Sequence, residues 1–271
     1  MPHAPILIPA VAGSRQDDAL MTISAMRKAA RMMIAAAADT LIVISPHSPG
    51  ISKPIGIWRG ERLHGSLRAF GFPHLTIDLP TDSLLADKVA ILSAHYGLKA
   101  ISITECSLDH GATVPLWFAA EAGWNGPTVV VTLNSADQKT LVVLGETIAE
   151  ATGATNRCGT LIASGDMSHR LTIGAPLGYD PRGREFDNWL VDVLRRGTYH
   201  DLLQLDSQLD EAAAQDVIAP LLVVVAALGF SAAGSEVLSY EGPFGVGYSV
   251  AILCRDTTIE VPTIKKGGIC D

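Results

Sequence analysis

Three histidines follow short apolar segments whose composition is typical of buried β-strands. They are His47, His110 and His169. In an open α/β sheet, ligands bind beyond the carboxyl ends of the strands, so parallel strands would bring these imidazoles to one edge. His3 lies in a Pro-His-Ala-Pro segment and would join them if that segment enters the sheet nearby. The sequence therefore predicts a cluster of imidazoles, whose chemistry is metal binding or proton transfer.

A carboxylate in the C-terminal part of the chain is a candidate partner for these imidazoles. Glu241 ends a predicted strand, and the glycines of the following segment, 242–247, would let the backbone approach a buried site. Two imidazoles and one carboxylate suit non-haem iron(II), because that arrangement leaves coordination positions open. Three histidines would instead suit a hydrolytic zinc site. Composition and spacing do not choose between these two sites.

Each of these residues also has an ordinary structural explanation. A histidine after a strand often caps a helix or bonds a loop carbonyl. That explanation must then apply separately to each of the three histidines that follow a strand. Asp109 and Asp166 precede candidate histidines, where either would orient an imidazole or begin a helix, and we interpret Asp109 as a helix N-cap. The remaining histidines lack this context, and we expect them at the surface. They are His64, His74, His95 and His200.

Short apolar segments alternate with helical patterns along most of the chain. The predicted strands are Thr40–Ser45, Lys99–Thr104, Pro127–Leu133 and Thr160–Ser164. The predicted helices are Ala19–Ala38, Ser83–Tyr96, Thr113–Glu121, Ala136–Ala151, Gly183–Arg196 and the apolar run Val217–Phe230. This alternation predicts a single α/β domain: a central mixed sheet flanked by helices, with the metal site at a sheet edge. Two further strands, Ser235–Tyr240 and Tyr248–Cys254, predict a hairpin that would form an antiparallel edge of that sheet.

The composition excludes several classes of protein. Of the 271 residues, 48% are hydrophobic and 18% charged, which allows a large core and rules out a disordered chain. Twenty basic residues against 28 acidic ones give a net charge of −8, so nucleic acid is not an expected partner. The run 217–230 is shorter than the roughly 20 residues of a membrane span, so we expect a buried helix and no membrane partner.

The four cysteines and the N-terminal segment bear on the compartment. No pair of cysteines has CxxC spacing, so a zinc knuckle or a redox dithiol is not supported. The segment MPHAPILIPA has neither a basic start nor a long apolar core, so it does not match a signal peptide. These features favour a cytoplasmic protein with reduced thiols, for which a homo-oligomer is a common state.

Five segments, in this order along the chain, resemble a known family. They are Pro2–Pro9, Ile44–His47, Leu108–Leu116, Gly165–His169 and Tyr240–Gly242. Together they are similar to the class III extradiol ring-cleavage dioxygenases, which include the protocatechuate 4,5-dioxygenase catalytic subunit and the DOPA-dioxygenase type. The segments LDHGATVPL and GDMSH are the most specific. The resemblance spans nearly the whole chain and implies one catalytic domain over residues 1–271.

The resemblance implies a role for each candidate residue. His3, His47 and Glu241 match the iron(II) ligands of the family. His169 matches its acid–base histidine, and His110 matches a second active-site histidine that contacts substrate or bound oxygen. Family members cleave a catechol ring beside its two hydroxyls, using dioxygen and no organic cofactor. The resemblance therefore implies an oxidoreductase of aromatic compound catabolism, whose partners are a small aromatic diol and dioxygen.

Two other functions stay open at this point. Memo-like proteins are similar to the same family, and a protein of that type would keep the pocket for binding without oxygenation. A zinc hydrolase would use the same histidines, with an activity that does not depend on oxygen. Metal analysis separates the first alternative from a dioxygenase, and the oxygen dependence of the activity separates the second.

Overall fold

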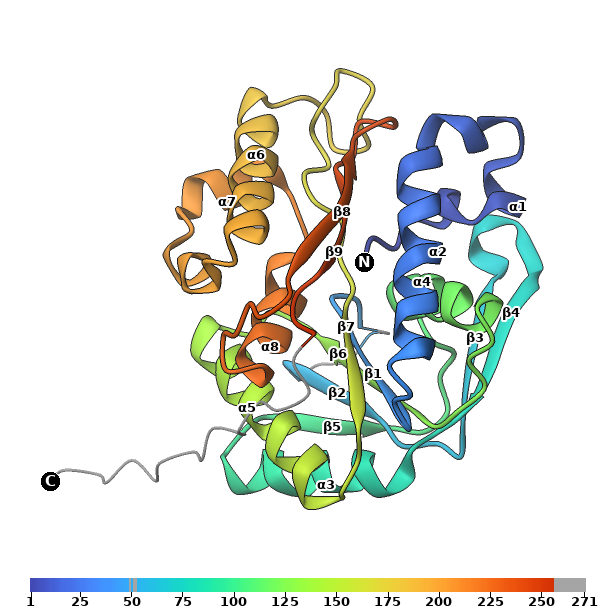
Figure 1. Cartoon of the computed structure of the whole chain (residues 1–271), viewed down its shortest axis with the longest axis vertical. Coiled ribbons are helices and arrows are strands. Elements are labelled where there is room, and N and C mark those ends of the chain that lie inside the picture. Colours follow the sequence, from blue (N-terminus) through green and yellow to red (C-terminus); the bar gives the residue numbers. More distant parts are fainter. Residues whose placement is uncertain (49, 51–52, 256–271) are drawn as a thin grey trace, which may run out of the picture.

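Five strands form the central sheet of the protein (Figure 1). The computed structural model describes residues 1–48, 50 and 53–255. Across the sheet the strands lie in the order β5-β2-β6-β1-β7. Their bounds are β1 (Thr40–Ser45), β2 (Ile55–Trp58), β5 (Ala100–Ile103), β6 (Thr128–Leu133) and β7 (Gly159–Ala163). The predicted α/β domain with a mixed sheet is thereby confirmed.

The directions of the strands decide where the loops that follow them emerge. Strand β1 is parallel to both of its neighbours, β6 and β7, but β2 pairs antiparallel to β6 and parallel to β5. Strand β5 therefore ends at the edge opposite to the one where β1 and β7 end. The expectation that parallel strands carry all three histidines to one edge holds for His47 and His169 and is wrong for His110. That residue returns toward the site through the connection 104–109, which follows β5.

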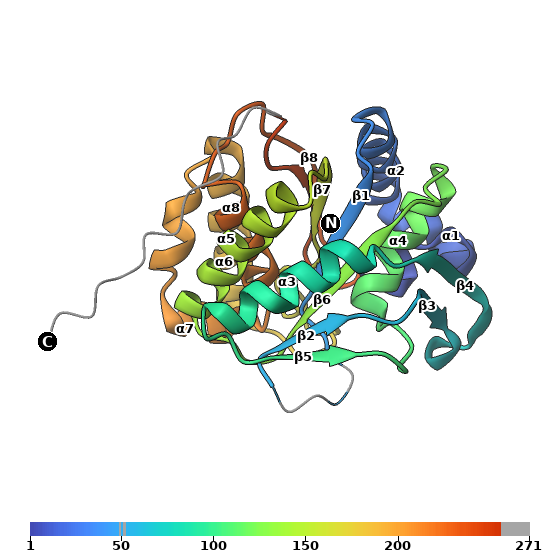
Figure 2. The same cartoon turned by 90° about the horizontal axis from the view of Figure 1, so that it is seen from below.

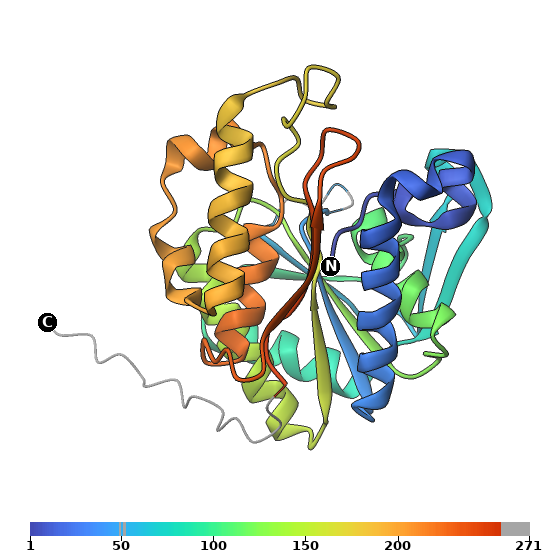
Figure 3. The same ribbon diagram turned by 45° about the horizontal axis from the view of Figure 1, so that its top comes forward.

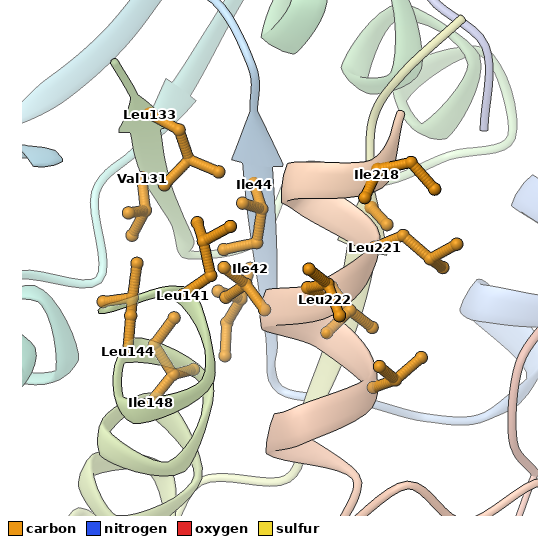
Figure 4. Packing of buried hydrophobic residues seen from close by; sticks show 14 of the residues in the cluster. Ile42, Ile44, Val131, Leu133, Leu141, Leu144, Ile148, Ile218, Leu221 and Leu222 are labelled. Carbon is orange, nitrogen blue, oxygen red and sulfur yellow. The ribbon is translucent and has the colours of Figure 1, made fainter. Parts of the chain in front are cut away.

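The strands form because their side chains are apolar toward both faces, as is typical of a sheet covered on both sides. Every residue of β1 and β6 is buried. Along β1, Ile42 and Ile44 join one hydrophobic cluster, whereas Leu41 and Val43 join the other. This alternation follows from the two-residue period of a strand, so one short segment contributes to both halves of the core. Figure 4 shows the first cluster, in which Ile42 and Ile44 lie beside side chains of two helices.

Helices cover both faces of the sheet (Figure 3). Residues of α2 (Leu20–Ala35) and α4 (His110–Glu121) belong to one cluster. Residues of α3, α5, α6, α7 and α8 belong to the other cluster. The bounds of these five helices are Ser83–His95, Gln138–Ala154, Pro181–Arg196, Ser207–Ala213 and Ile218–Ala227. A short helix α1 (Pro9–Ala12) and four 3-10 turns, at Pro5–Leu7, Gly13–Ala19, Arg68–Phe70 and Tyr199–Gln204, complete the described helical segments.

Two hairpins lie outside the central sheet. Strands β3 (Arg62–Leu67) and β4 (Phe72–Pro80) form an antiparallel arm on the side of the molecule away from α6 and α7 (Figure 2). The sequence did not predict this arm or β2. Strands β8 (Glu236–Glu241) and β9 (Tyr248–Ile252) form the predicted C-terminal hairpin. Within the described residues this hairpin is a separate two-stranded sheet and does not pair with the edge of the central one.

The longest apolar run forms the predicted buried helix. Nearly every side chain of α8 is buried in the cluster that also holds α5. None of the helices that the structure describes is both long and apolar enough to cross a membrane.

Candidate metal centre

Three side chains from distant parts of the chain meet at one point. His3 precedes the first 3-10 turn, His47 follows β1, and Asp216 lies between α7 and α8. The Nε2 atoms of the two histidines are 3.1 Å apart. Oδ2 of Asp216 lies 3.3 Å from Nε2 of His3 and 3.5 Å from Nε2 of His47. The three atoms thus form a nearly equilateral triangle of possible ligands.

The hydrogen bonds around His3 decide which of its two ring nitrogens offers a lone pair to this triangle. Nδ1 lies 3.1 Å from Oγ of Ser164, and the Ser164 hydroxyl donates to the carbonyl of Gly111 at 2.5 Å. Because that hydroxyl hydrogen is already used, Oγ of Ser164 accepts the Nδ1 hydrogen of His3. Nε2 is then unprotonated in the neutral ring, which is the state that a metal ion requires.

Two carboxylates, the buried Asp166 and the half-buried Asp216, act on the same histidine. Oδ1 of Asp166 accepts the backbone N–H of His3 at 2.8 Å, and Oδ1 of Asp216 accepts the backbone N–H of Asp166 at 2.7 Å. Burial by itself would lower the pKa of His3, but Asp166 and Asp216 outweigh this effect and raise the pKa to about 9. Burial likewise opposes ionisation of Asp216, yet the hydrogen bond and charge of His3 leave its pKa lowered. The negative charge that favours a protonated His3 equally favours a divalent cation at this point.

His110 completes a group of three imidazoles. Its ring stacks on that of His47 with centroids 4.4 Å apart, and it meets the ring of His3 edge-on at 5.2 Å. Ligand atoms of the three histidines all lie within 4.8 Å of one another. Burial, with the neighbouring charges on His3 and His47, lowers the pKa of His110 to about 3. His110 is therefore neutral at physiological pH and able to donate one hydrogen bond.

The start of α4 holds His110 in this position. Asp109 is the helix N-cap that the sequence predicted, because its Oδ1 accepts the N–H of Ala112 at 3.0 Å. The same oxygen accepts the hydroxyl of Ser45, at the end of β1, at 2.8 Å. A Cβ on Gly111 would lie 2.4 Å from Oγ of Ser45 and 3.1 Å from Cδ2 of His47. A glycine at position 111 is thus required for the first turn of α4 to approach the end of β1.

His169 lies after β7 and close to the same group. Its Nδ1 donates to the carbonyl of Ala214 at 2.8 Å, and its backbone N–H donates to the carbonyl of Ala213 at 3.0 Å. The charge of His169 contributes to the lowered pKa of His110, which places the two side chains in electrostatic reach. Since Nδ1 carries the hydrogen, Nε2 of the neutral ring is free to accept a proton.

Glu241, the carboxylate expected from the sequence, lies elsewhere. Its Oε1 accepts the backbone N–H of Thr22 at 2.7 Å and the Thr22 hydroxyl at 2.6 Å. Thr22 belongs to the first turn of α2, where a helix has unsatisfied N–H groups and a positive dipole end, so a carboxylate is favourable there. The structure therefore differs from the expected ligand set: Asp216 is the carboxylate beside the two imidazoles.

Asp216 was missed because its sequence context indicates a different role. It directly precedes the apolar run that forms α8, and an aspartate at that point is ordinarily interpreted as a helix cap. An acidic residue before a buried helix was the one available signal for Asp216, and it is a weak one.

The structure confirms the histidines that the sequence predicted at the surface, since His64, His74, His95 and His200 are all exposed.

The donor triangle fits a divalent metal ion. Bonds of about 2.0–2.2 Å to nitrogen and oxygen separate neighbouring ligand atoms by about 3–3.5 Å, as observed here. Without a cation or a shared proton, these three lone-pair atoms would repel one another at such distances. Two imidazoles and a carboxylate are a donor set typical of non-haem iron(II), whereas the group of three imidazoles suits zinc.

Comparisons with known proteins show what this chain is similar to. A family model described as the catalytic LigB subunit of aromatic ring-opening dioxygenase matches residues 1–251. Protein CA_C1420 of Clostridium acetobutylicum is 29% identical over an alignment of 261 residues, which covers 92% of this chain and 55% of that protein. The chain thus spans about half the length of this curated relative.

A solved structure shares the fold. The uncharacterized protein JW3007 from Escherichia coli K12 superposes with a TM-score of 0.60 at 16% identity, over 83% of this chain and 91% of that one. At this identity the likeness concerns the fold alone.

Proposed function

This chain belongs to the family of the catalytic LigB subunit of aromatic ring-opening dioxygenase, and from that premise we propose that it is an iron(II)-dependent extradiol dioxygenase acting on a catechol-like ring. The observation that carries the proposal is the triangle of His3, His47 and Asp216. It supplies two imidazole nitrogens and one carboxylate, the donor set of non-haem iron(II) sites that keep coordination positions open for substrate.

Bound iron(II) would lower the pKa of the catechol hydroxyls that coordinate it and transfer electron density from the ring to dioxygen. The protein residues supply orientation and proton transfer. Ser164 fixes the ring of His3 through Nδ1, and Asp166 fixes the carboxylate of Asp216 through its backbone N–H. These contacts hold the ligand atoms before the metal arrives, which reduces the cost of ordering them on binding.

His169 is the proposed acid–base residue. Its Nδ1 is engaged by the Ala214 carbonyl, so Nε2 accepts the proton of a substrate hydroxyl and later returns it. A positioned imidazole in this role typically contributes about 10²–10⁴ in rate. Because His169 is not one of the three ligand residues, its loss should impair turnover far more than metal binding.

His110 is the proposed hydrogen-bond donor to a substrate oxygen. Its depressed pKa, about 3, keeps the ring uncharged beside the two histidine ligands. A charged imidazolium at this position would repel a divalent cation, so the neutral form serves both metal binding and substrate orientation.

The group of three imidazoles favours one second candidate, a zinc-dependent hydrolase. In that case His110 would take the third ligand position with His3 and His47. Its activity would require zinc and would be indifferent to oxygen. Iron loading and oxygen dependence therefore separate the two candidates.

The test is anaerobic loading with iron(II), followed by oxygen and a panel of catechols. We expect oxygen uptake together with a yellow ring-fission product. The matched variants are Asp216→Asn, which should lose stoichiometric iron, and Glu241→Gln, which should keep it. Iron-loaded protein that yields no product across a broad panel would defeat the proposed activity. Loss of iron from Glu241→Gln but not from Asp216→Asn would defeat the ligand assignment.

A further inference from the structure

The connection between α7 and α8, residues 214–217, contributes to the proposed site at two points. Asp216 supplies the carboxylate of the ligand triangle. Two residues earlier, the carbonyl of Ala214 accepts the Nδ1 hydrogen of His169, the proposed acid–base residue, at 2.8 Å. One short segment therefore positions both a metal ligand and the group proposed to transfer protons.

Hydrogen bonds hold this connection against the segment that follows β7. The backbone N–H of Asp216 donates to the carbonyl of Asp166 at 3.2 Å, and the N–H of Asp166 donates to Oδ1 of Asp216 at 2.7 Å. Just before the connection, the carbonyl of Ala213 accepts the backbone N–H of His169 at 3.0 Å. A Cβ on Gly165 would lie 2.3 Å from a Cα atom of the connection, so the two segments approach closely only with glycine there. A shift of the connection would therefore shift His169 as well.

The start of α8 lacks the usual side-chain cap. The N-cap residue is Val217, and its side chain makes no capping hydrogen bond. Asp216 does not serve as the cap either, because its Oδ1 accepts the N–H of Asp166 and its Oδ2 lies beside the two histidine ligands. The first N–H groups of a helix have no acceptor within the helix, and leaving them unpaired in a buried place is unfavourable. The start of α8 therefore needs an acceptor from another side chain.

Gln215 supplies that acceptor. Its Oε1 accepts the N–H of Ile218, the first residue of α8, at 2.8 Å. Its Nε2 donates to Oδ1 of Asp210, on α7, at 2.5 Å. These partners fix the orientation of the amide, because a backbone N–H requires an oxygen and a carboxylate requires a donor. The side chain of Gln215 thus joins α7 to the start of α8, next to the ligand residue.

We propose that Gln215 is a positioning residue of the metal centre. Because it caps α8 in place of Asp216, both carboxylate oxygens of Asp216 serve the site, and the connection stays in register with His169. This inference rests on the proposed function, since it takes Asp216 as a metal ligand. Without the Gln215 amide, the N–H groups of α8 would compete for the Asp216 carboxylate, because aspartate is an effective helix cap.

The test is anaerobic calorimetric titration with iron(II) alone, so it needs no catechol and no turnover. Gln215→Met keeps the length of the side chain but removes its amide, and it should weaken iron binding about 10- to 100-fold, as is typical when a group that orients a ligand is lost. Gln208→Met is the matched control, because Gln208 is an exposed residue of α7. It should bind iron as tightly as the wild type. Wild-type affinity in Gln215→Met would overturn the positioning role.

A reversed hydrogen bond separates this role from a general loss of structure. Gln215→Glu by itself places a second carboxylate against Asp210 and should weaken iron binding. When it is combined with Asp210→Asn, the introduced carboxylate accepts both the introduced amide and the N–H of Ile218, so iron affinity should recover. Circular dichroism verifies that both variants are folded. A folded double variant that binds iron no more tightly than Gln215→Glu would overturn the proposal.

Hydrogen exchange reports on His169 directly. In the wild type, iron should slow exchange in the peptide that contains His169, because a coordinated Asp216 fixes the connection that accepts the His169 N–H. In Gln215→Met saturated with iron this slowing should be smaller, whereas in Gln208→Met it should match the wild type. Mass spectrometry measures both variants. Equal slowing in the two would overturn the coupling of Asp216 to His169 through Gln215.

Failure of this inference is distinguishable from failure of the proposed function. Full iron affinity in Asp216→Asn would overturn the ligand assignment, and the role of Gln215 with it. Full affinity in Gln215→Met, together with loss of iron from Asp216→Asn, would overturn the role of Gln215 alone. Absence of a ring-fission product in the oxygen assay would count against the proposed activity and would leave these affinities unaffected.

Discussion

Asp187 should make the stability of this protein fall as the pH rises from about 4 to 6. Its carboxylate is fully buried on α6. Oδ1 accepts the N–H of Ser168 at 2.9 Å, and Oδ2 accepts the hydroxyl of Tyr240 at 2.7 Å. These bonds favour the charged form, but burial outweighs them and raises the pKa of Asp187 from 3.8 to about 6. The folded state therefore holds this proton more tightly than the unfolded state does.

The sign and the magnitude follow from that difference. Between the two pKa values the folded protein binds more protons, so the free energy of unfolding decreases as the pH rises. A shift of about two units, at 1.36 kcal/mol each, corresponds to about 3 kcal/mol lost between pH 4 and somewhat above pH 6. Asp187→Asn retains an acceptor for Ser168 and has no charge to bury. Its stability relative to the wild type should thus rise by about 3 kcal/mol across this window.

The assay is urea unfolding of both proteins at several pH values, with a chelator present so that metal release does not contribute. Asp192→Asn is the matched control, because Asp192 is an exposed residue of the same helix. It should show the same pH profile as the wild type. A stability difference between Asp187→Asn and the wild type that stays constant from pH 4 to 7 would refute the reasoning.

Three other predictions concern the proposed site. Ala214 has a left-handed backbone with φ of 50°, so Ala214→Gly should stabilise the folded protein by about 1 kcal/mol. Ala212→Gly, within α7, should destabilise the folded protein by about as much. Thermal unfolding measures both effects. Phe70 is 43% exposed and its ring lies 5.2 Å from that of His110, so Phe70→Ala should raise KM for a catechol about two- to tenfold with iron content unchanged. The control residue is Phe72, whose ring faces that of His74. Phe72→Ala should leave KM unchanged, and an equal effect of the Phe70 and Phe72 variants on KM would count against contact of Phe70 with substrate. His169→Ala should lower kcat about 10²–10⁴-fold while retaining iron, and loss of iron would contradict a proton-transfer role.

Much of the fold was predictable from local patterns. The segment Thr40–Ser45 is apolar and β-branched, and it forms β1 with the bounds that the sequence suggested. The run before Phe230 forms α8, because an uninterrupted apolar helix has to be buried on all sides. Strand β2 and the β3–β4 arm were missed. The arm presents alternating exposed and buried residues in a short polar stretch, which resembles a loop.

The sequence predicted the type of site, a histidine cluster with a carboxylate, but not every residue of it. The placement of His47 after a buried strand suggested a histidine cluster at the sheet edge, and the structure brings its Nε2 within 3.1 Å of Nε2 of His3. His110 arrives by another route, since the antiparallel β2–β6 pair reverses the direction of β5. No local pattern encodes that reversal, because it depends on which edges of separate strands become neighbours.

The sequence by itself determined the alternating α/β architecture, the buried strands and the imidazoles that gather around the end of β1. Hydrophobic periodicity and residue type are local properties, and they are sufficient for those features. Only the tertiary structure decided which carboxylate meets the imidazoles. Asp216 and Glu241 both lie at the ends of elements, and either is chemically able to coordinate a metal. Packing places one of them 3.3 Å from His3 and the other on the first turn of α2, a choice made by contacts between segments some two hundred residues apart.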